Sequence, residues 1–136
     1  MTGKNRDYER LVRAFLRGQE SWEALEQIGV KVKFRDQSPW FSEAPKITVT
    51  VLVEEIAAGF LALEDRPRDI QVWATIVRHS DLIDLEDRFE TDPRADTLLE
   101  GIADAAFGET PEDRVFAVAR ELAVVSAPEP STTSGC

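Results

Sequence analysis

Apolar residues recur with the 3.6-residue period of an α-helix in five separate segments, and this pattern constrains the fold more than any other feature. The segments span residues 6–17, 51–61, 67–77, 93–107 and 110–122. In the first of them, Tyr8, Leu11, Val12 and Phe15 form a single apolar face. Helices of this kind bury their apolar faces by packing on one another, so the sequence predicts a mostly helical domain.

Capping residues predict where these helices begin and end. Ser21 is placed to cap a short sixth helix that Gly29 would end. Thr50 is the predicted N-cap of the helix that follows, where Glu54 and Glu55 favour the positive helix start. Pro67 marks the first position of the next helix. Thr91 or Asp92 is placed to cap the helix that has Pro93 in its first turn, and Thr110-Pro111-Glu112-Asp113 opens the last one.

Two short segments alternate apolar and polar residues, as half-buried strands do. They are residues 30–34 and 47–51, and we expect them to pair as a two-stranded antiparallel ribbon. The connection at 35–46 contains Pro39 and Pro45, which favour a loop. An alternative is that residues 47–50 only lead into the next helix. The predicted class is therefore mostly α (α+β), with about six helices and one ribbon.

The length of 136 residues suits one domain, which we place at residues 1–125. Residues 126–136 are rich in Pro, Ser and Thr and are predicted to form a disordered tail. No apolar run is long enough to cross a membrane, and the first residues lack the apolar core of a secretion signal. Cys136 has no second cysteine to pair with, so we expect a cytoplasmic protein.

The net charge of −10 is unevenly distributed. Residues 1–45 hold eight basic and seven acidic residues, whereas residues 46–136 hold eight basic and nineteen acidic ones. A negative field of this kind repels nucleic acid and attracts basic proteins, although acidic surfaces also serve solubility alone. The charge therefore predicts no direct nucleic-acid binding and is compatible with a basic protein partner.

The acidic residues gather in one region. A first group lies between the third and fourth periodic segments: Asp81, Asp84, Glu86, Asp87, Glu90 and Asp92. In the helix that follows, Asp92, Asp96, Glu100 and Asp104 recur every four residues. Like charges at this spacing oppose helix formation by roughly 0.2–0.5 kcal/mol per pair. Because solvated faces usually mix charges, an unmixed stripe indicates a surface that meets positive charge.

The sequence contains no recognisable catalytic or metal-binding motif. His79 is the only histidine, and both calcium-loop registers that start at Asp81 or Asp84 lack the required ligand positions. Ser80 adjoins His79, but neighbouring residues on a helix do not face each other. His79 is better explained as a helix-end residue whose charge favours the last carbonyl groups. We expect no enzyme activity and no cofactor.

Two aromatic residues lie in the predicted loop. Trp40 and Phe41 are either exposed anchors for a partner or packed onto the core, and the sequence does not choose between these alternatives.

Two segments resemble known bacterial proteins. RLVRAFLRGQESWEALE, residues 10–26, is similar to the opening of small immunity proteins, which are cytoplasmic antidotes to nuclease toxins. Residues 51–107 resemble small acidic bacterial proteins through Val53-Glu54-Glu55, Trp73-Ala74 and Asp81-Leu82-Ile83-Asp84. Thr75 departs from the polar amide that follows Trp-Ala in those proteins. The resemblance implies inhibition by binding.

We therefore expect a non-enzymatic, immunity-type inhibitor that covers the cationic cleft of a basic partner such as a nuclease toxin. The residues expected to bind it are Asp81, Asp84, Glu86, Asp87, Glu90, Asp92, Asp96, Glu100, Asp104, Trp40 and Phe41. An alternative is a self-associating assembly module, in which a basic helical stripe of one copy meets the acidic stripe of another. That stripe consists of Arg6, Arg10, Arg13 and Arg17.

Overall fold

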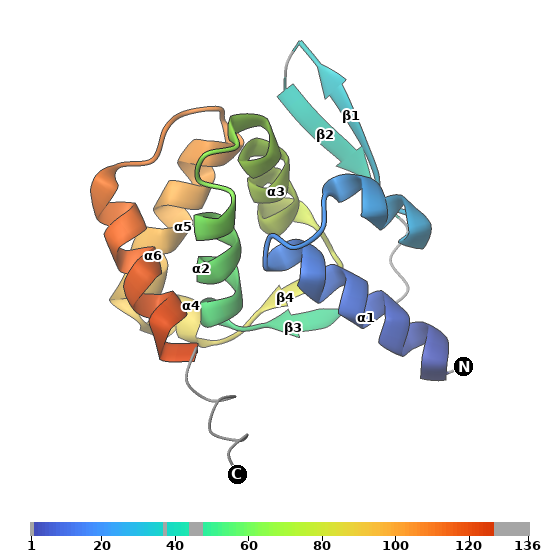
Figure 1. Ribbon diagram of the computed structural model, residues 1–136, viewed down its shortest axis with the longest axis horizontal. Coiled ribbons are helices and arrows are strands. Elements are labelled where there is room, and N and C mark those ends of the chain that lie inside the picture. The colour runs from blue at the N-terminus through green and yellow to red at the C-terminus, as the bar shows by residue number, and fades with distance from the viewer. Residues whose placement is uncertain (1, 37, 44–47, 127–136) are drawn as a thin grey trace.

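The computed structural model describes residues 2–36, 38–43 and 48–126 and confirms a mostly helical α+β domain (Figure 1). The helices are α1 (Thr2–Leu16), the 3-10 helix η1 (Trp22–Ile28), α2 (Val53–Ala62), α3 (Pro67–His79), α4 (Arg88–Thr91), α5 (Pro93–Ala106) and α6 (Asp113–Ser126). The strands are β1 (Lys31–Arg35), β2 (Ser38–Ser42), β3 (Val49–Val51) and β4 (Ile83–Leu85). The predicted tail lies outside the described residues, except for Ser126 at the end of α6.

Helix α2 lies at the centre of the helical packing. It contacts α6 most extensively, and α3 packs along α5. Gly59 of α2 is required there, because a Cβ atom at this position would lie 1.8 Å from the carbonyl oxygen of Leu16. The indole N–H of the buried Trp73 donates to the same Leu16 oxygen at 3.1 Å. The end of α1 is thus fixed against α2 and α3 by close backbone approach and one buried hydrogen bond.

The predicted ribbon exists, but its second strand was wrongly assigned. β1 pairs antiparallel with β2, so residues 38–42 form a strand inside the segment that was predicted to be a loop. Pro39 is tolerated because a two-stranded ribbon consists of edges, where a missing N–H costs little. Asp36 adopts a left-handed backbone with a φ of 53°, which suits a tight hairpin turn. The hairpin stands apart from α5 and α6 in Figure 1.

The second predicted strand is also real, but it has a different partner. β3 pairs parallel with β4, with Thr50 opposite Asp84. Val49 and Val51 are buried, whereas Thr50 between them is exposed, as the alternation predicts. Parallel strands need a long crossover, and here the crossover consists of α2 and α3. Ile47, the predicted start of this strand, lies outside the described residues.

The predicted helix ends are largely confirmed, with one correction. Ser21 accepts a hydrogen bond from the Glu23 N–H, and Gly29 ends η1 in the left-handed conformation. Asp92, rather than Thr91, caps α5. Thr50 does not cap α2, because it belongs to β3 and α2 begins at Val53.

Candidate functional site

The acidic stripe of α5 lies on the outward face of that helix. Asp96 and Glu100 are exposed and Asp92 and Asp104 are half-buried, whereas the opposite face buries Ala95, Leu98, Gly101, Ile102 and Ala105. The predicted orientation is therefore confirmed. Within α5, only Arg94 carries a positive charge, and it lies in the first turn.

Three of the predicted partner-binding acids are already engaged within the protein. Glu86 binds Arg88 at 2.7 Å and accepts the N–H of Val53 at 2.6 Å. Asp92 accepts the backbone N–H of Arg94 at 2.9 Å and pairs with its guanidinium at 3.1 Å.

The third, Glu100, pairs at 2.8 Å with Arg114, which comes from the start of α6. Because both of these side chains are more than half exposed, this pair contributes little to stability. Arg114 nevertheless supplies a positive charge next to the stripe, which the spacing of residues within α5 could not reveal.

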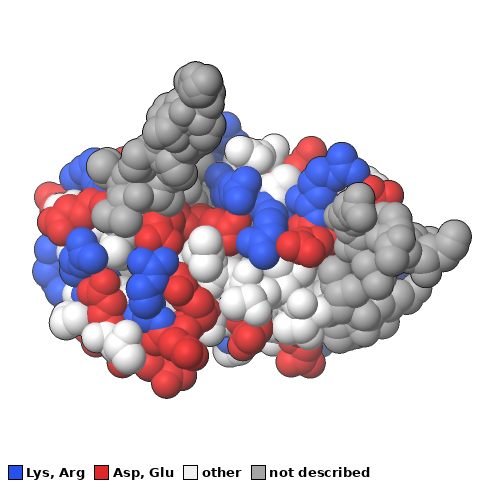
Figure 2. All heavy atoms as spheres, turned by 90° about the horizontal axis from the view of Figure 1, so that it is seen from below, with Lys and Arg blue, Asp and Glu red and all other residues white. Residues whose placement is uncertain are grey.

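The remaining predicted acids carry carboxylates that have no hydrogen bond or ion pair to the described residues. They are Asp81, Asp84, Asp87, Glu90, Asp96 and Asp104. All except Asp104 are exposed. Figure 2 shows the face that carries β3, β4 and α4, where acidic and basic side chains lie next to one another. On this face the charge is therefore mixed rather than uniformly acidic.

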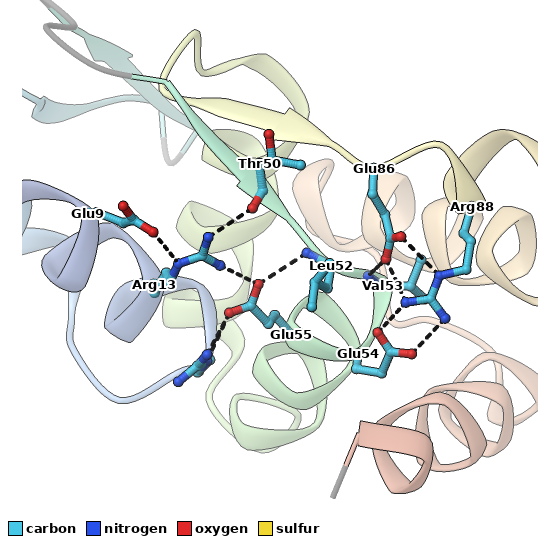
Figure 3. A network of polar contacts seen from close by, with 10 residues as sticks. Glu9, Arg13, Thr50, Leu52, Val53, Glu54, Glu55, Glu86 and Arg88 are labelled. Atoms are coloured by element: carbon cyan, nitrogen blue, oxygen red, sulfur yellow. Dashed lines mark hydrogen bonds and ion pairs between the residues drawn. The ribbon is translucent and has the colours of Figure 1, made fainter. Parts of the chain in front are cut away.

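Part of the basic stripe on α1 forms ion pairs with a carboxylate of the same chain. Glu55, which is only 7% exposed, binds Arg13 at 2.6 Å and Arg17 at 2.7 Å (Figure 3). Arg10 pairs with Asp7 at 2.6 Å, and the side chain of Arg6 lies outside the described residues. Three of the four predicted self-association residues thus pair with an acid of their own chain, two of them with the buried Glu55.

A second guanidinium site adjoins the first at the start of α2. Arg88 donates to both oxygens of Glu54, at 2.7 Å for one of them, and to both oxygens of Glu86 (Figure 3). Such forked contacts are among the stronger hydrogen bonds in proteins. Glu54 is only 7% exposed on its side chain, so Arg88 compensates a carboxylate that would otherwise be costly to bury.

The same carboxylates satisfy the first N–H groups of α2. Glu55 accepts from the N–H of Leu52 at 3.1 Å, and Glu86 accepts from that of Val53. Helix starts normally rely on a Ser, Thr, Asp or Asn cap, which Leu52 cannot provide. We call Arg13, Arg17, Glu54, Glu55, Glu86 and Arg88 the ion-pair network.

These contacts lower the pKa of each carboxyl group in the network. The Arg88 guanidinium holds the pKa values of Glu54 and Glu86 below the ordinary value of 4.5. For Glu55, burial acts in the opposite direction, but the Leu52 N–H and the guanidinium groups of Arg17 and Arg13 outweigh it and lower the pKa. All three groups are therefore charged at neutral pH, as an ion-pair network requires.

The two predicted aromatic anchors lie on β2 and differ in exposure. Trp40 is 39% exposed, whereas Phe41 is half-buried and packs against the core. Lys33 and Arg35 lie within 5.7 Å and 5.5 Å of the Trp40 ring centroid. Lys33 and Arg35 would therefore repel a basic partner at Trp40. This makes Trp40 a poor anchor for the partner that the acidic residues are expected to bind.

The described residues were compared with the requirements of a metal site and of a membrane-spanning helix. Among the described residues, no three His, Cys, Asp or Glu side chains are grouped as metal ligands would be. His79 is exposed and ends α3, as predicted. None of the described helices combines the length and apolar character needed to span a membrane.

Comparisons with protein-family models, with curated proteins and with solved structures find no match to this chain. The resemblance to immunity proteins consequently stays a prediction.

Proposed function

We propose that this protein is a non-enzymatic binding protein whose acidic surface docks on a basic protein, as an immunity-type inhibitor does. We define the acidic surface as the free carboxylates of Asp81, Asp84, Asp87, Glu90, Asp96 and Asp104. The observation that carries the proposal is the outward stripe on α5, where Asp96, Glu100 and Asp104 recur every four residues although this spacing opposes the helix, and where only Glu100 pairs with a cation of the described residues. Complementary charge on a partner would remove that cost.

The mechanism is occlusion. A nuclease binds its substrate in a cationic cleft, and a surface with closely spaced carboxylates can fill such a cleft and exclude the phosphate backbone. Electrostatic attraction would accelerate association, which suits an inhibitor that has to act before the nuclease reaches nucleic acid. Glu86 and Asp92 contribute to the negative field, although their oxygens already bind within the chain.

The test measures association with a panel of basic nuclease domains by surface plasmon resonance. We expect the association rate to fall steeply as salt rises from about 50 to 300 mM, because exposed charges become screened. The double variant Asp96→Lys/Asp104→Lys should associate roughly tenfold more slowly. Asp96 and Asp104 are better probes than Glu100, whose carboxylate already binds Arg114.

A matched control separates the acidic surface from net charge. Glu20→Lys/Glu64→Lys changes the charge by the same amount at two exposed acids outside α5. This control should lower the association rate much less than the α5 double variant does. If the two double variants are equally slow, or if no basic domain binds, the proposed function is wrong.

The alternative, self-association through α1, has less support because Glu55 occupies Arg13 and Arg17. Sedimentation velocity at low and high salt tests it directly. A salt-sensitive dimer or larger assembly would favour this alternative, whereas a monomer under both conditions would leave the inhibitor as the better proposal.

A further inference from the structure

A groove separates the β1–β2 hairpin from the helices and differs in character from the rest of the molecule. It has a volume of about 550 Å³ and is lined by β2, the C-terminal half of α3 and the end of α5. A volume of this size matches the pockets that hold small molecules. Trp40 comes from the hairpin side, and Arg78 and Phe107 come from the helical side.

Two exposed aromatic rings line this groove. Trp40 is 39% exposed and Phe107 is 72% exposed, so both are among the most exposed large apolar side chains of the described residues. Leaving such rings in water forgoes a large gain from burial. A flat ligand that stacks on either ring would recover part of that free energy.

At least one cationic side chain lies close to each of these two rings. Lys33 and Arg35 project from β1 beside Trp40, and the Arg78 guanidinium carbon lies 5.2 Å from the Phe107 ring centroid. None of these three cations forms an ion pair with an acid in the part of the chain that the structure describes. Arg78 lines the groove, and Lys33 and Arg35 lie next to it at the Trp40 ring. On a protein with a net charge of −10, three neighbouring cations without an ion pair to the described residues favour an anionic ligand.

Glu43 is the one acidic residue among those that line the groove. Its Oε1 accepts from the Ser80 hydroxyl and its Oε2 accepts from the Asp81 N–H, both at 2.6 Å. Glu43 follows the end of β2, so it lies about 10 Å along the chain direction from Trp40. The groove is thus basic at one end, where Trp40 lies, and carries one fixed carboxylate at the other.

We propose that this groove binds a mononucleotide, with the base stacked on Trp40 or Phe107 and the phosphate held by Lys33, Arg35 and Arg78. A base edge with N–H donors would point toward Glu43, whose oxygens can accept further hydrogen bonds. A long nucleic acid is disfavoured, because its remaining phosphates would meet the acidic surface. The proposal is independent of the inhibitor function.

The test uses two-dimensional NMR of the indole N–H groups, titrated with GMP. Trp22, Trp40 and Trp73 give three separate probes, and we expect the Trp40 signal to shift most, because Trp73 is buried. Guanosine lacks the phosphate and ribose 5-phosphate lacks the flat ring. Each should bind at least about fivefold more weakly than GMP, since base stacking and charge both contribute.

The hairpin supplies a matched pair of variants. Trp40→Ala should weaken GMP binding at least about fivefold. Phe34 lies on the opposite face of the hairpin, is 38% exposed and has Arg68 over its ring at 4.6 Å, so Phe34→Ala removes an equally exposed ring outside the groove. Phe34→Ala should leave GMP affinity unchanged, provided that circular dichroism shows an intact fold.

The charge contribution is tested with Lys33→Ser/Arg35→Ser against Arg68→Ser. The first should weaken GMP binding and the second should not. Three results would overturn the proposal: no shift of the Trp40 signal with GMP, equal binding of ribose 5-phosphate, or tighter binding of a glutamate-rich peptide than of GMP. The last result would assign the groove to an acidic protein instead.

Discussion

The carboxylates at the start of α2 and those along α5 are chemically alike, yet the protein uses them in opposite ways. Glu54 and Glu55 are only 7% exposed, and each is neutralised by at least one guanidinium. Asp96 and Asp104 have no cationic partner among the described residues. Position, rather than residue type, thus decides whether an acid stabilises the fold or remains available to a partner.

The ion-pair network should therefore be sensitive to the loss of a single carboxylate. Glu55→Gln leaves Arg13 and Arg17 without their shared anion, and Arg13 is only 27% exposed. We expect the free energy of unfolding to fall by about 2–3 kcal/mol, below the full cost of breaking a buried pair because both guanidinium groups reach water. Urea denaturation measures this change. Glu109→Gln, at an exposed acid without an ion pair to the described residues, should stay within about 0.5 kcal/mol of the unsubstituted protein.

Replacing the cation instead of the acid gives a second test of the same region. Arg88→Met removes the partner of both Glu54 and Glu86, and we expect a loss of about 2 kcal/mol at pH 7. The deficit should shrink as the pH falls toward 4, because the unpaired Glu54 can then become neutral. A deficit that does not change with pH would show that Arg88 acts through packing alone.

The lowered pKa values of Glu54, Glu55 and Glu86 predict a pH dependence of unfolding. The stabilisation from depressed pKa values is complete above the ordinary value of 4.5 and is lost as the pH falls through the lower folded-state values. The melting temperature should therefore fall below about pH 4.5. Melting curves of Glu55→Gln should show a shallower decline, and a parallel decline would contradict the role of Glu55.

On α5, substitution of an acid should have a small effect whose sign depends on position. Asp104→Lys removes a like charge near the negative C-terminal end of the helix and should raise the free energy of unfolding by about 0.5 kcal/mol. Asp96→Lys, in the first turn, loses a favourable interaction with the helix start and should be neutral or slightly destabilising. Thermal melts of the two variants provide the comparison. Losses above about 1 kcal/mol at both sites would show that these acids are structural.

The helices were predictable because their signals are local. Pro67 and Pro93 occupy the first positions of α3 and α5, as the sequence indicates, and the outward direction of the acidic stripe follows from its spacing. These features depend on residues within one or two turns of each other. Local periodicity and capping were therefore sufficient to predict the helices and the mostly helical class.

The strand pairing was not predictable in the same way. The sequence between β1 and β2 contains no glycine, the residue that usually marks a tight hairpin turn, and Pro39 within residues 38–42 favours a loop over a strand. The β3–β4 pair joins strands whose contact depends on how α2 and α3 pack. No signal in either strand specifies that partner.

The ion-pair network was missed for a similar reason. Glu54 and Glu55 were expected at a helix start, but Glu55 binds Arg13 of α1 and Glu54 binds Arg88, the first residue of α4. The sequence predicts Glu86 to be a surface acid that binds a partner. In the structure its carboxylate accepts a hydrogen bond from the Val53 N–H at the start of α2. The sequence showed Arg13 and Arg17 on one helical face, but it did not show that Glu55 is the acid that binds them.

The parallel pairing of β3 with β4 has a consequence for the order of folding. Each strand has only three residues, too few to be stable alone, and α2 and α3 lie between them in the chain. Closing a loop of about 30 residues costs entropy that three paired residues cannot repay, so the helices have to assemble first. We expect Val51→Ala to accelerate unfolding while leaving the refolding rate nearly unchanged, which marks this pair as a late event that locks an already formed helical core.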